Sequence, residues 1–469
     1  MTHPSFPLEP DETQRALLND AVLSFTEHFL SERATAPASL PAADPELLRR
    51  LLAPPEERAR PLDSVFEDFA AALGTGFDTT SPGHLSYIPS GGIYSSALAG
   101  FLGAVTNRYT GGSHASPGCV AMEESVIRWM TSLFGLPEAA GGILLSGGSL
   151  ANLTAVVTAR SSFGEDFREG VIYASTAAHH SVSKSTRIAG IAPDRVRQVP
   201  TTSQLTIDVG ALRAAIASDR AAGLRPMMIV SNAGTTDTGS IDPIAECAAV
   251  AASEGAWHHV DAAYGGFFQL TERGRERLAG ISLADSITVD AHKSLFLPFG
   301  IGGLLVRDRS TLAGAHEGRG SYMQDVAGSG LPHYFALGPE LTRPNRGLTV
   351  WFPLQIHGVA LFRDALDAML DRADWTAQQI AAMPAFEIVC KCDLSVVAFR
   401  AVAGDAESRR IFEALNATHE LHLSSTTVDG QFVLRLAFLS QRAGMRVAER
   451  VIEPFCGRSR PGSTESRSL

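Results

Sequence analysis

The chain has 469 residues, of which 45% are hydrophobic, and 50 acidic against 39 basic side chains give a formal net charge of −11. This length allows two or three domains with a substantial core, whereas the acidic balance lacks the basic face that nucleic acid or an anionic membrane requires. We therefore expect no nucleic acid and no membrane as a partner. The five cysteines are scattered and the first residues are polar and acidic, so we predict a reduced, cytoplasmic protein without a signal peptide.

Residues 1–90 are predicted to form helices separated by proline-rich breaks. Apolar residues recur there at helical spacing in three stretches, and Asp11, Asp44 and Asp63 stand where helix N-caps are expected. A segment with so little core of its own is expected to pack on another surface.

Residues 91–350 alternate short apolar runs with amphipathic stretches, which predicts an α/β domain. One of its helices is expected to begin with Asp242 as N-cap and Pro243 at the first helical position. The pattern predicts a mostly parallel sheet of about seven strands with helices on both faces. The predicted strands are residues 142–146, 170–175, 195–200, 226–234, 257–264, 286–291 and 302–308. Residues 351–458 mix helices with strands and are predicted to form a small α+β domain, and residues 459–469 a disordered tail.

Five of the predicted strands run directly into small, hydroxyl-bearing, histidine, carboxylate or lysine residues. Ligands of open parallel sheets bind beyond the carboxyl ends of the strands, so we expect these residues to share one edge of the sheet. The segments are Ser146 to Ser149, 177–185, 233–239, Asp261 and 290–293.

Lys293 lies between two apolar runs, in a chain that has only two other lysines, Lys184 and Lys391. Arginine stays protonated, whereas a desolvated lysine can lose its proton and form a Schiff base. The alternative is a surface lysine whose stem is covered while its amine reaches water. A general preference of the genome for arginine would also explain the scarcity of lysine.

The other strand-end features have structural interpretations too. The Ser-Gly-Gly-Ser turn could be a plain connection to a helix, or a cradle whose backbone N–H groups bind a phosphate. Asp261 could cap a helix, or its carboxylate could pair with a protonated ring nitrogen. His179 and His180 could be surface residues, or one of them could stack on a planar cofactor. Neither a GxGxxG nor a GxxxxGK[ST] pattern occurs, which argues against dinucleotide and P-loop sites.

One ligand explains an amine, an anion cradle and a strand-end carboxylate together, namely pyridoxal 5′-phosphate. Lys293 would hold its aldehyde as an imine, the cradle would hold its phosphate, and Asp261 would keep its pyridine nitrogen protonated. No metal is predicted.

At these residues the sequence resembles the group II pyridoxal-phosphate-dependent amino acid decarboxylases, and within them the aromatic-L-amino-acid decarboxylase pattern. The resemblance covers residues 11–455 and implies the fold-type I transferase fold. The motifs that carry it are GILLSGGSLANLTAV, AHHSVSK, AGTTDTGSIDP, HVDAAYGG, DAHKSLFLP and FVLRLAFLS.

The resemblance implies roles for individual residues. Lys293 matches the Schiff-base lysine, Asp261 the partner of the ring nitrogen, and His179 the ring-stacking histidine. The implied cofactor-binding residues are Gly147, Gly148, Ser149, His179, Thr236, Asp261, Ala263, Asp290, His292 and Lys293. The implied substrate-binding residues are Tyr87, Ser90, His179 and Arg435, where Arg435 either binds the substrate carboxylate or supports the site.

The family resembled is a homodimer with its active site at the subunit interface. The resemblance therefore implies a homodimer in which residues 1–90 pack on the partner subunit. In that family a mobile loop of the partner carries a tyrosine that returns a proton to the substrate. Residues 318–351 occupy the place of this loop, and Tyr334 matches that tyrosine by its distance from Trp351. The predicted catalytic residues are therefore Lys293, Tyr334, His179 and Asp261.

Around the substrate pocket the resemblance is weaker. Thr79, Ile88, Gly111 and Ser113 stand where relatives have aromatic residues, and His114 is added, so an aromatic substrate would gain less stacking energy. Aromatic, aliphatic and polar amino acids all remain open as substrates.

The implied reaction is the decarboxylation of an L-amino acid to an amine and CO₂, through the lysine Schiff base and a quinonoid intermediate. Alternatives are aldehyde-forming decarboxylation with oxidative deamination, transamination, and a catalytically silent homologue. In the family resembled, aldehyde-forming members alter the stacking histidine or the loop tyrosine, and the presence of both His179 and Tyr334 favours simple decarboxylation. Silent homologues lose the lysine or the aspartate, and both Lys293 and Asp261 are present.

Overall fold

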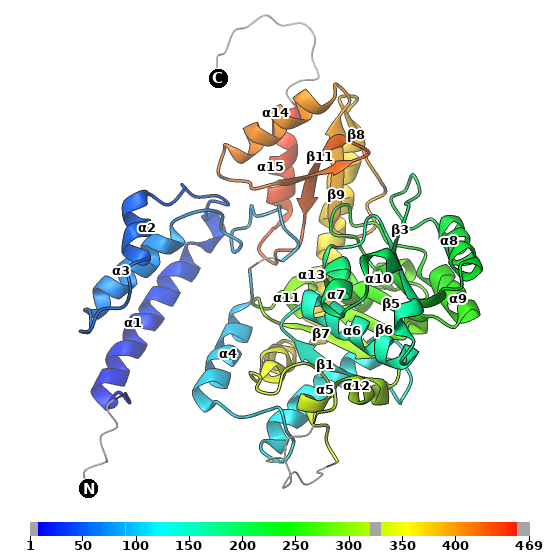
Figure 1. Ribbon diagram of the computed structural model, residues 1–469. Coiled ribbons are helices and arrows are strands. Elements are labelled where there is room, and N and C mark those ends of the chain that lie inside the picture. Colours follow the sequence, from blue (N-terminus) through cyan, green and yellow to red (C-terminus); the bar gives the residue numbers. More distant parts are fainter. Residues whose placement is uncertain (1–7, 90, 319–329, 457–469) are drawn as a thin grey trace, which may run out of the picture.

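The computed structural model describes residues 8–89, 91–318 and 330–456, and a seven-stranded sheet forms the centre of its large body (Figure 1). The strand order is β1-β7-β6-β5-β4-β2-β3. Strand β7 is antiparallel to both of its neighbours, and the other four neighbouring pairs are parallel. The predicted seven-stranded, mostly parallel sheet is therefore confirmed. Its strands are β1 (Gly141–Leu145), β2 (Gly170–Ser175), β3 (Val196–Val199), β4 (Arg225–Asn232), β5 (Trp257–Ala262), β6 (Ser286–Val289) and β7 (Gly302–Val306).

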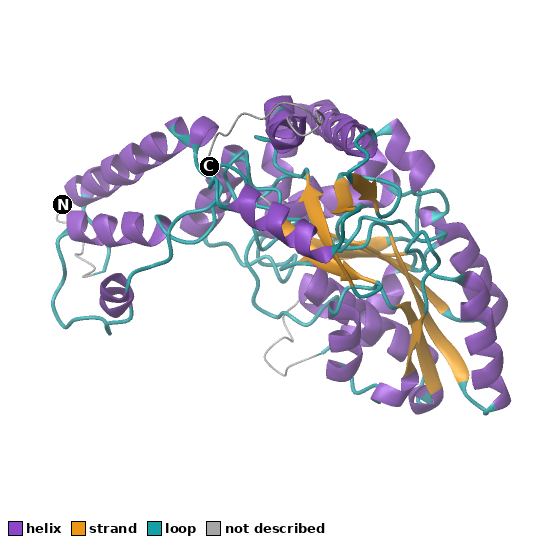
Figure 2. Ribbon diagram, turned by 90° about the horizontal axis from the view of Figure 1, so that it is seen from above, coloured by secondary structure: helices purple, strands orange, loops and turns teal. Residues whose placement is uncertain are grey.

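Helices cover both faces of this sheet (Figure 2). Because side chains alternate along a strand, Ile172 and Ala174 of β2 pack toward one layer while Val171 and Tyr173 pack toward the other. The first layer contains α6 (Gly148–Phe163), α7 (Ser181–Ile188) and α12 (Arg309–His316). The opposite layer contains α5 (Pro117–Leu133), α8 (Val209–Ala221), α9 (Ile244–Glu254) and the first half of α13 (Arg346–Ala381). Two shorter helices are α10 (Glu272–Arg277) and α11 (Ala291–Ser294).

The C-terminal part forms a second, smaller sheet, as predicted. Its four strands are antiparallel in the order β10-β11-β9-β8 and share a core with the end of α13. The strands are β8 (Phe386–Ile388), β9 (Val396–Ala401), β10 (Ser424–Val428) and β11 (Gln431–Ala437), and the helices are α14 (Asp405–Asn416) and α15 (Met445–Cys456). The predicted tail, residues 459–469, lies outside the described residues.

The N-terminal helices α1 (Glu12–Ser31), α2 (Pro45–Leu51) and α3 (Leu62–Leu73) stand apart from the body in both views (Figures 1 and 2). The N-caps Asp11 and Asp44 are confirmed, because their carboxylates accept from the backbone N–H groups of Gln14 and Leu47. The prediction for Asp63 is wrong, because α3 is preceded by Pro61 and Asp63 lies inside the first turn.

These N-terminal helices and the following α4 (Tyr94–Thr106) leave a large apolar surface uncovered. Helix α1 has no buried residue at all. The exposed apolar side chains include Leu17, Leu18, Val22, Leu23, Val65, Phe69, Leu98, Phe101, Leu102 and Val105. Among the described residues, no helix combines the length and the apolar character that crossing a bilayer demands.

Asp242 was expected to cap α9, and the structure corrects this. The N-cap is Pro243. The Asp242 carboxylate is buried instead, where it accepts from the backbone N–H groups of Ile207 and Asn232, both at 2.7 Å, and from Asn232 Nδ2 at 2.8 Å. Burial raises the pKa of Asp242, and these donors oppose that rise. Asp242 thus fixes the end of β4.

Candidate active site

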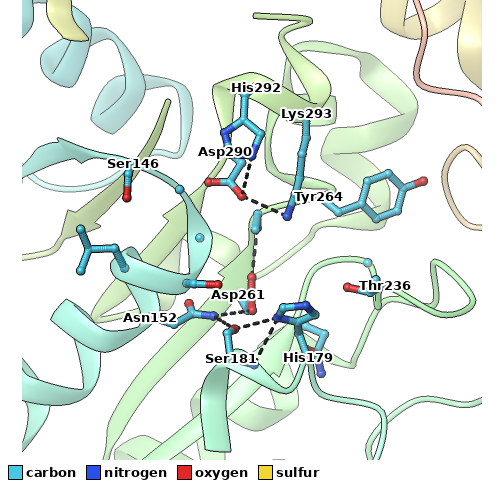
Figure 3. Close-up of a pocket in the computed structure, with 17 residues that line it drawn as sticks. Ser146, Asn152, His179, Ser181, Thr236, Asp261, Tyr264, Asp290, His292 and Lys293 are labelled. Carbon is cyan, nitrogen blue, oxygen red and sulfur yellow. Dashed lines mark hydrogen bonds and ion pairs between the residues drawn. The ribbon is translucent and has the colours of Figure 1, made fainter. Parts of the chain in front are cut away.

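The carboxyl ends of β1, β2, β4, β5 and β6 meet around one cavity of about 280 Å³ (Figure 3). Its volume lies near the lower end of small-molecule sites. The cavity is lined by all ten residues that were predicted to bind a cofactor. These residues are Gly147, Gly148, Ser149, His179, Thr236, Asp261, Ala263, Asp290, His292 and Lys293. The structure thus brings together residues that are up to 146 positions apart in the sequence.

The first wall of the cavity is the turn from β1 into α6. Gly147 has φ 155° and ψ 177°, a backbone region that is essentially confined to glycine. A Cβ on Gly148 would lie 2.9 Å from Asp290 Oδ2 and 3.1 Å from Ala263 Cβ, so any side chain there would obstruct the cavity. Because no described side chain caps α6, its first N–H groups and the positive end of its dipole are available to an anion.

Lys293 enters the cavity from α11, a single helical turn that follows β6. Its side chain is 18% exposed, and its Nζ lies 3.0 Å from Asp290 Oδ2. Asp290 Oδ1 is buried and has no hydrogen-bond partner. His292 Nε2 is 3.7 Å from the same carboxylate, but burial lowers the pKa of His292. The neutral imidazole therefore leaves Lys293 as the main partner of Asp290.

Asp261 lies at the end of β5, on the side of the cavity opposite Lys293 and close to His179 (Figure 3). Its Oδ1 accepts from Ala263 N at 3.1 Å, and its Oδ2 accepts from Asn152 Nδ2 at 2.8 Å. Each oxygen therefore keeps a lone pair for a further donor.

His179 stands beside Asp261 at the start of the segment that leads into α7. Burial lowers the pKa of His179, although the nearby Asp261 carboxylate partly opposes this. The ring is thus a neutral imidazole near pH 7. Its neighbour His180 packs against it with ring centroids 4.1 Å apart but is exposed and does not line the cavity. The choice of the first histidine of the pair agrees with this geometry.

The cavity therefore combines a primary amine, an anion-binding helix terminus and a carboxylate that can hold a protonated nitrogen. Across the described parts of the chain, no group of three or more His, Cys, Asp or Glu side chains is placed to hold a metal ion. This donor set suits an organic aldehyde that carries a phosphate and a basic ring nitrogen.

A model of the pyridoxal-dependent decarboxylase conserved domain matches residues 45–402. The chain belongs to this family. An aromatic-L-amino-acid decarboxylase of Bacillus atrophaeus is 32% identical over 77% of the chain and 78% of the relative. An L-2,4-diaminobutyrate decarboxylase of Rhizobium meliloti (strain 1021) is 30% identical over 95% and 92%. A crystal structure of Oryza sativa TDC with PLP and tryptamine superposes with a TM-score of 0.90 at 26% identity, over 97% of the chain and 99% of the other.

This decarboxylase is an enzyme that uses pyridoxal phosphate and has the fold of its family. The cavity residues fit that cofactor. Lys293 offers the amine for the aldehyde, Gly148 leaves the space that a phosphate needs at the α6 terminus, and Asp261 offers the acceptor for the ring nitrogen.

The prediction that Tyr334 is the proton-donating tyrosine of a mobile loop is corrected by its position. Its side chain is 0% exposed, and its hydroxyl donates to Glu124 Oε2 at 3.3 Å. Arg343 covers its ring at 4.9 Å, and Tyr334 does not line the cavity. The side chain is locked in the core of its own subunit. The other tyrosine of the predicted loop, Tyr322, lies outside the described residues.

Arg435 does not line the cavity either, and it acts as a support. Its Nε donates to Asp237 O at 2.5 Å and its Nη1 to Ser424 Oγ at 2.6 Å, while Nη2 donates to Thr236 O. A fourth bond reaches Ser86 O at 3.3 Å. These bonds to the chain's own loops agree with the second of its two predicted roles, support of the site, and its contact with a substrate carboxylate stays a prediction.

Of the two remaining predicted substrate residues, Tyr87 does not line the described cavity. Tyr87 is 50% exposed and packs against Phe77, with ring centroids 5.3 Å apart. Ser90 lies outside the described residues.

Sequence reasoning missed several residues that line the cavity, chief among them Asn152, Ser181, Asn232 and Tyr264. Asn152 lies three residues after Ser149 on α6, and residues at that spacing share a helix face, which is a signal that was available in the sequence. Asn232 ends β4 and was also accessible to the strand-end argument. Tyr264 gave no such signal.

Proposed function

We propose that this chain decarboxylates an L-amino acid to the corresponding amine and CO₂, with Lys293 as the covalent attachment point of the cofactor. The observation that carries the proposal is that the Lys293 amine, the Asp261 carboxylate and the N-terminus of α6 all face one cavity. The family to which the chain belongs is one of pyridoxal-dependent decarboxylases. The cavity has one group for each reactive part of pyridoxal phosphate, namely its aldehyde, its phosphate and its ring nitrogen.

Bound pyridoxal phosphate supplies an electron sink for the bond that breaks at the substrate's α-carbon. The protein's own groups would hold and orient that cofactor. The α6 terminus binds the phosphate, and Asp261 accepts a hydrogen bond from the ring nitrogen and so keeps its proton in place. The neutral His179 forms a wall of the site, and the buried strand ends keep water from the reacting atoms.

Lys293→Ala, compared with Lys184→Ala, tests the attachment. Lys184 is exposed on α7, so its loss should leave the visible absorbance of the bound cofactor unchanged, whereas Lys293→Ala should abolish it. Borohydride reduction followed by peptide mass mapping should place the cofactor on the Lys293 peptide, which is easily resolved because the chain has three lysines. Label on either other lysine would refute the proposal.

Product analysis tests the reaction type. Amine and CO₂ in equal amounts, without ammonia or peroxide, are expected for simple decarboxylation. Aldehyde together with ammonia would establish the oxidative alternative, and a keto acid without CO₂ would establish transamination. Because the matching relatives bear names for aromatic and for diamino substrates, the panel should contain aromatic, aliphatic and diamino acids.

We also propose that the protein is a homodimer in which a second copy covers the apolar surface of α1, α3 and α4. A monomer rarely exposes so many neighbouring apolar side chains, and Phe101 at the centre of α4 is 58% exposed. Phe101→Glu should shift the sedimentation coefficient toward that of a monomer, whereas Leu283→Glu, also exposed but on another element, should not. A wild-type chain that sediments as a monomer contradicts this proposal. A cytoplasmic location stays a prediction from composition.

A further inference from the structure

Asn152 makes the most connected set of hydrogen bonds among the side chains beneath the cavity. It lies on α6, is buried, and has no predicted role. Its Nδ2 donates to Asp261 Oδ2 at 2.8 Å and to Ser181 Oγ at 2.9 Å, and its Oδ1 pairs with His259 Nε2 at 3.1 Å. The amide of Asn152 thus contacts Asp261 directly and reaches His179 through Ser181, so it is linked to both groups that face the cavity on this side (Figure 3).

The hydrogen-bond chemistry fixes which way this amide points. A carboxylate can only accept, so the NH₂ group must face Asp261 and the carbonyl must face His259. His259 therefore carries its proton on Nε2, and its Nδ1 accepts from Ser286 Oγ at 2.8 Å. Ser286 in turn accepts from Trp257 Nε1 at 2.7 Å. Every donor in this chain has an acceptor, and the chain ends on Asp261.

The second N–H of the same amide acts on His179 through Ser181. Because Ser181 Oγ accepts from Asn152, its own proton is free to donate to His179 Nδ1 at 2.8 Å. The backbone N–H of Ser181 also points to that nitrogen, at 3.3 Å. With two donors aimed at Nδ1, the ring must carry its single proton on Nε2.

We infer that Asn152 is a positioning residue that orients both cofactor-facing groups at once. It holds Asp261 as a hydrogen-bond acceptor for the ring nitrogen, and through Ser181 it holds His179 as the Nε2–H tautomer. This inference rests on the proposed function of Asp261 and His179, but the orientation of His179 can be measured without cofactor.

Two variants separate the link from Asn152 to Asp261 from the link that runs through Ser181 to His179. Asn152→Leu removes every bond of the amide while keeping a similar volume, and Ser181→Ala removes only the link to His179. Tyr173→Phe is the control, because it also deletes one buried polar bond, from Tyr173 to Asp219 at 2.9 Å, on the opposite face of the sheet. Asn152→Leu removes three buried bonds and should lose the most stability, whereas Ser181→Ala is the variant to match with Tyr173→Phe. A merely structural role predicts that these two matched variants behave alike in the measurements below.

The first measurement is ¹⁵N NMR of histidine-labelled, cofactor-free protein, with His179 assigned by its loss in His179→Gln. Wild type and Tyr173→Phe should show the Nε2–H tautomer of His179 alone. In Ser181→Ala the 2.8 Å donor to Nδ1 is lost and only the longer backbone bond at 3.3 Å remains, so the share of the Nδ1–H tautomer should rise. Asn152→Leu should raise it too, because Ser181 Oγ loses the donor that orients it. A single Nε2–H form in Ser181→Ala overturns the inference. If Asn152→Leu does not fold, Asn152→Ser replaces it with the same expectation.

The second measurement follows the visible absorbance of the bound cofactor against pH, together with kcat and KM. Asn152→Leu should shift the pH of the spectral change and lower kcat by roughly 10- to 100-fold, the range for residues that orient functional groups, with KM within about threefold. Ser181→Ala should leave the spectral change in place. A normal spectrum and kcat in Asn152→Leu would overturn the link to Asp261, while a wild-type protein that binds no cofactor would instead overturn the proposed function.

Discussion

Replacing Tyr334 by Phe should leave the products and the rate of the enzyme unchanged. The hydroxyl that the substitution removes lies in the core, where it donates to Glu124 Oε2 at 3.3 Å. Burial and the neighbouring carboxylates of Glu123 and Glu124 raise the pKa of Tyr334 well above its usual value. A side chain that keeps its proton and is 0% exposed in the core has no route to a substrate carbon in either subunit.

The cost in stability follows from the contacts of Glu124. A hydrogen bond to a charged group contributes about 1.5–3 kcal/mol, but 3.3 Å is long for an O–H donor. Glu124 also keeps Arg309, at 2.8 and 3.0 Å, and Arg128 at 2.9 Å. We therefore expect Tyr334→Phe to lower the free energy of unfolding by about 1 kcal/mol, below the usual charged range.

The assay compares the ratio of amine to aldehyde and the kcat of wild type, Tyr334→Phe and Tyr322→Phe. Tyr334→Phe should match wild type within about twofold, since a 1 kcal/mol change in a stable core leaves nearly all molecules folded. Tyr322→Phe tests the other tyrosine of the segment in which the family resemblance implied a proton donor. Aldehyde formation or a large loss of kcat in Tyr334→Phe would refute the reasoning from burial.

Two further predictions concern stability. Arg343 and Glu123 form a bidentate ion pair with both side chains 0% exposed and both distances 2.8 Å. Arg343→Met leaves a buried charge unpaired and should lower the free energy of unfolding, measured with denaturant, by about 3–5 kcal/mol, whereas the double variant Arg343→Met, Glu123→Leu should recover most of that loss. Equal losses in the single and double variants would contradict the coupling. Burial lowers the pKa of His258 to about 3 and that of His259 to about 4. These pKa values of the folded state lie below the value near 6.5 in the unfolded state, so the unfolded state binds more protons at acidic pH. The free energy of unfolding therefore falls as the pH drops from about 6.5 toward 4, by up to about 1.4 kcal/mol per pH unit for each histidine. Asp242, whose pKa burial raises, acts in the opposite direction, so the check is the difference in slope between wild type and His258→Gln, and identical slopes would contradict it.

The sheet and the cofactor half of the site were predictable because both follow from local patterns. Strand β5 reads as an apolar run that ends in Asp261, and β6 as one that leads to Lys293. Parallel neighbours must bring such ends to the same edge. The chemistry of each end residue then limits what can bind there, and no long-range contact has to be guessed.

Apart from Asp63, whose helix already begins at Leu62, the failures involve partners far apart in the sequence. Tyr334 was placed by its distance from Trp351, but spacing carries no information on burial, and Arg343 and Glu123 are 220 positions apart. Asp242 before Pro243 has the pattern of a helix cap, yet it bonds to Ile207, 35 positions away. In each case a buried charge found donors that only the folded chain supplies, and those donors outweighed the local preference.

The structure places the predicted cofactor residues and two of the predicted substrate residues differently. Every residue that lines the described cavity belongs to the segment between Ser146 and Lys293. This segment supplies an amine, an anion site and an acceptor, which are what a cofactor needs, but few groups that would distinguish one amino acid side chain from another. Of the expected substrate contacts, His179 belongs to this segment, whereas Tyr87 and Arg435 lie outside it. We therefore expect some of the groups that distinguish substrates to come from outside this segment, and in the homodimer proposed above a second subunit would supply such groups.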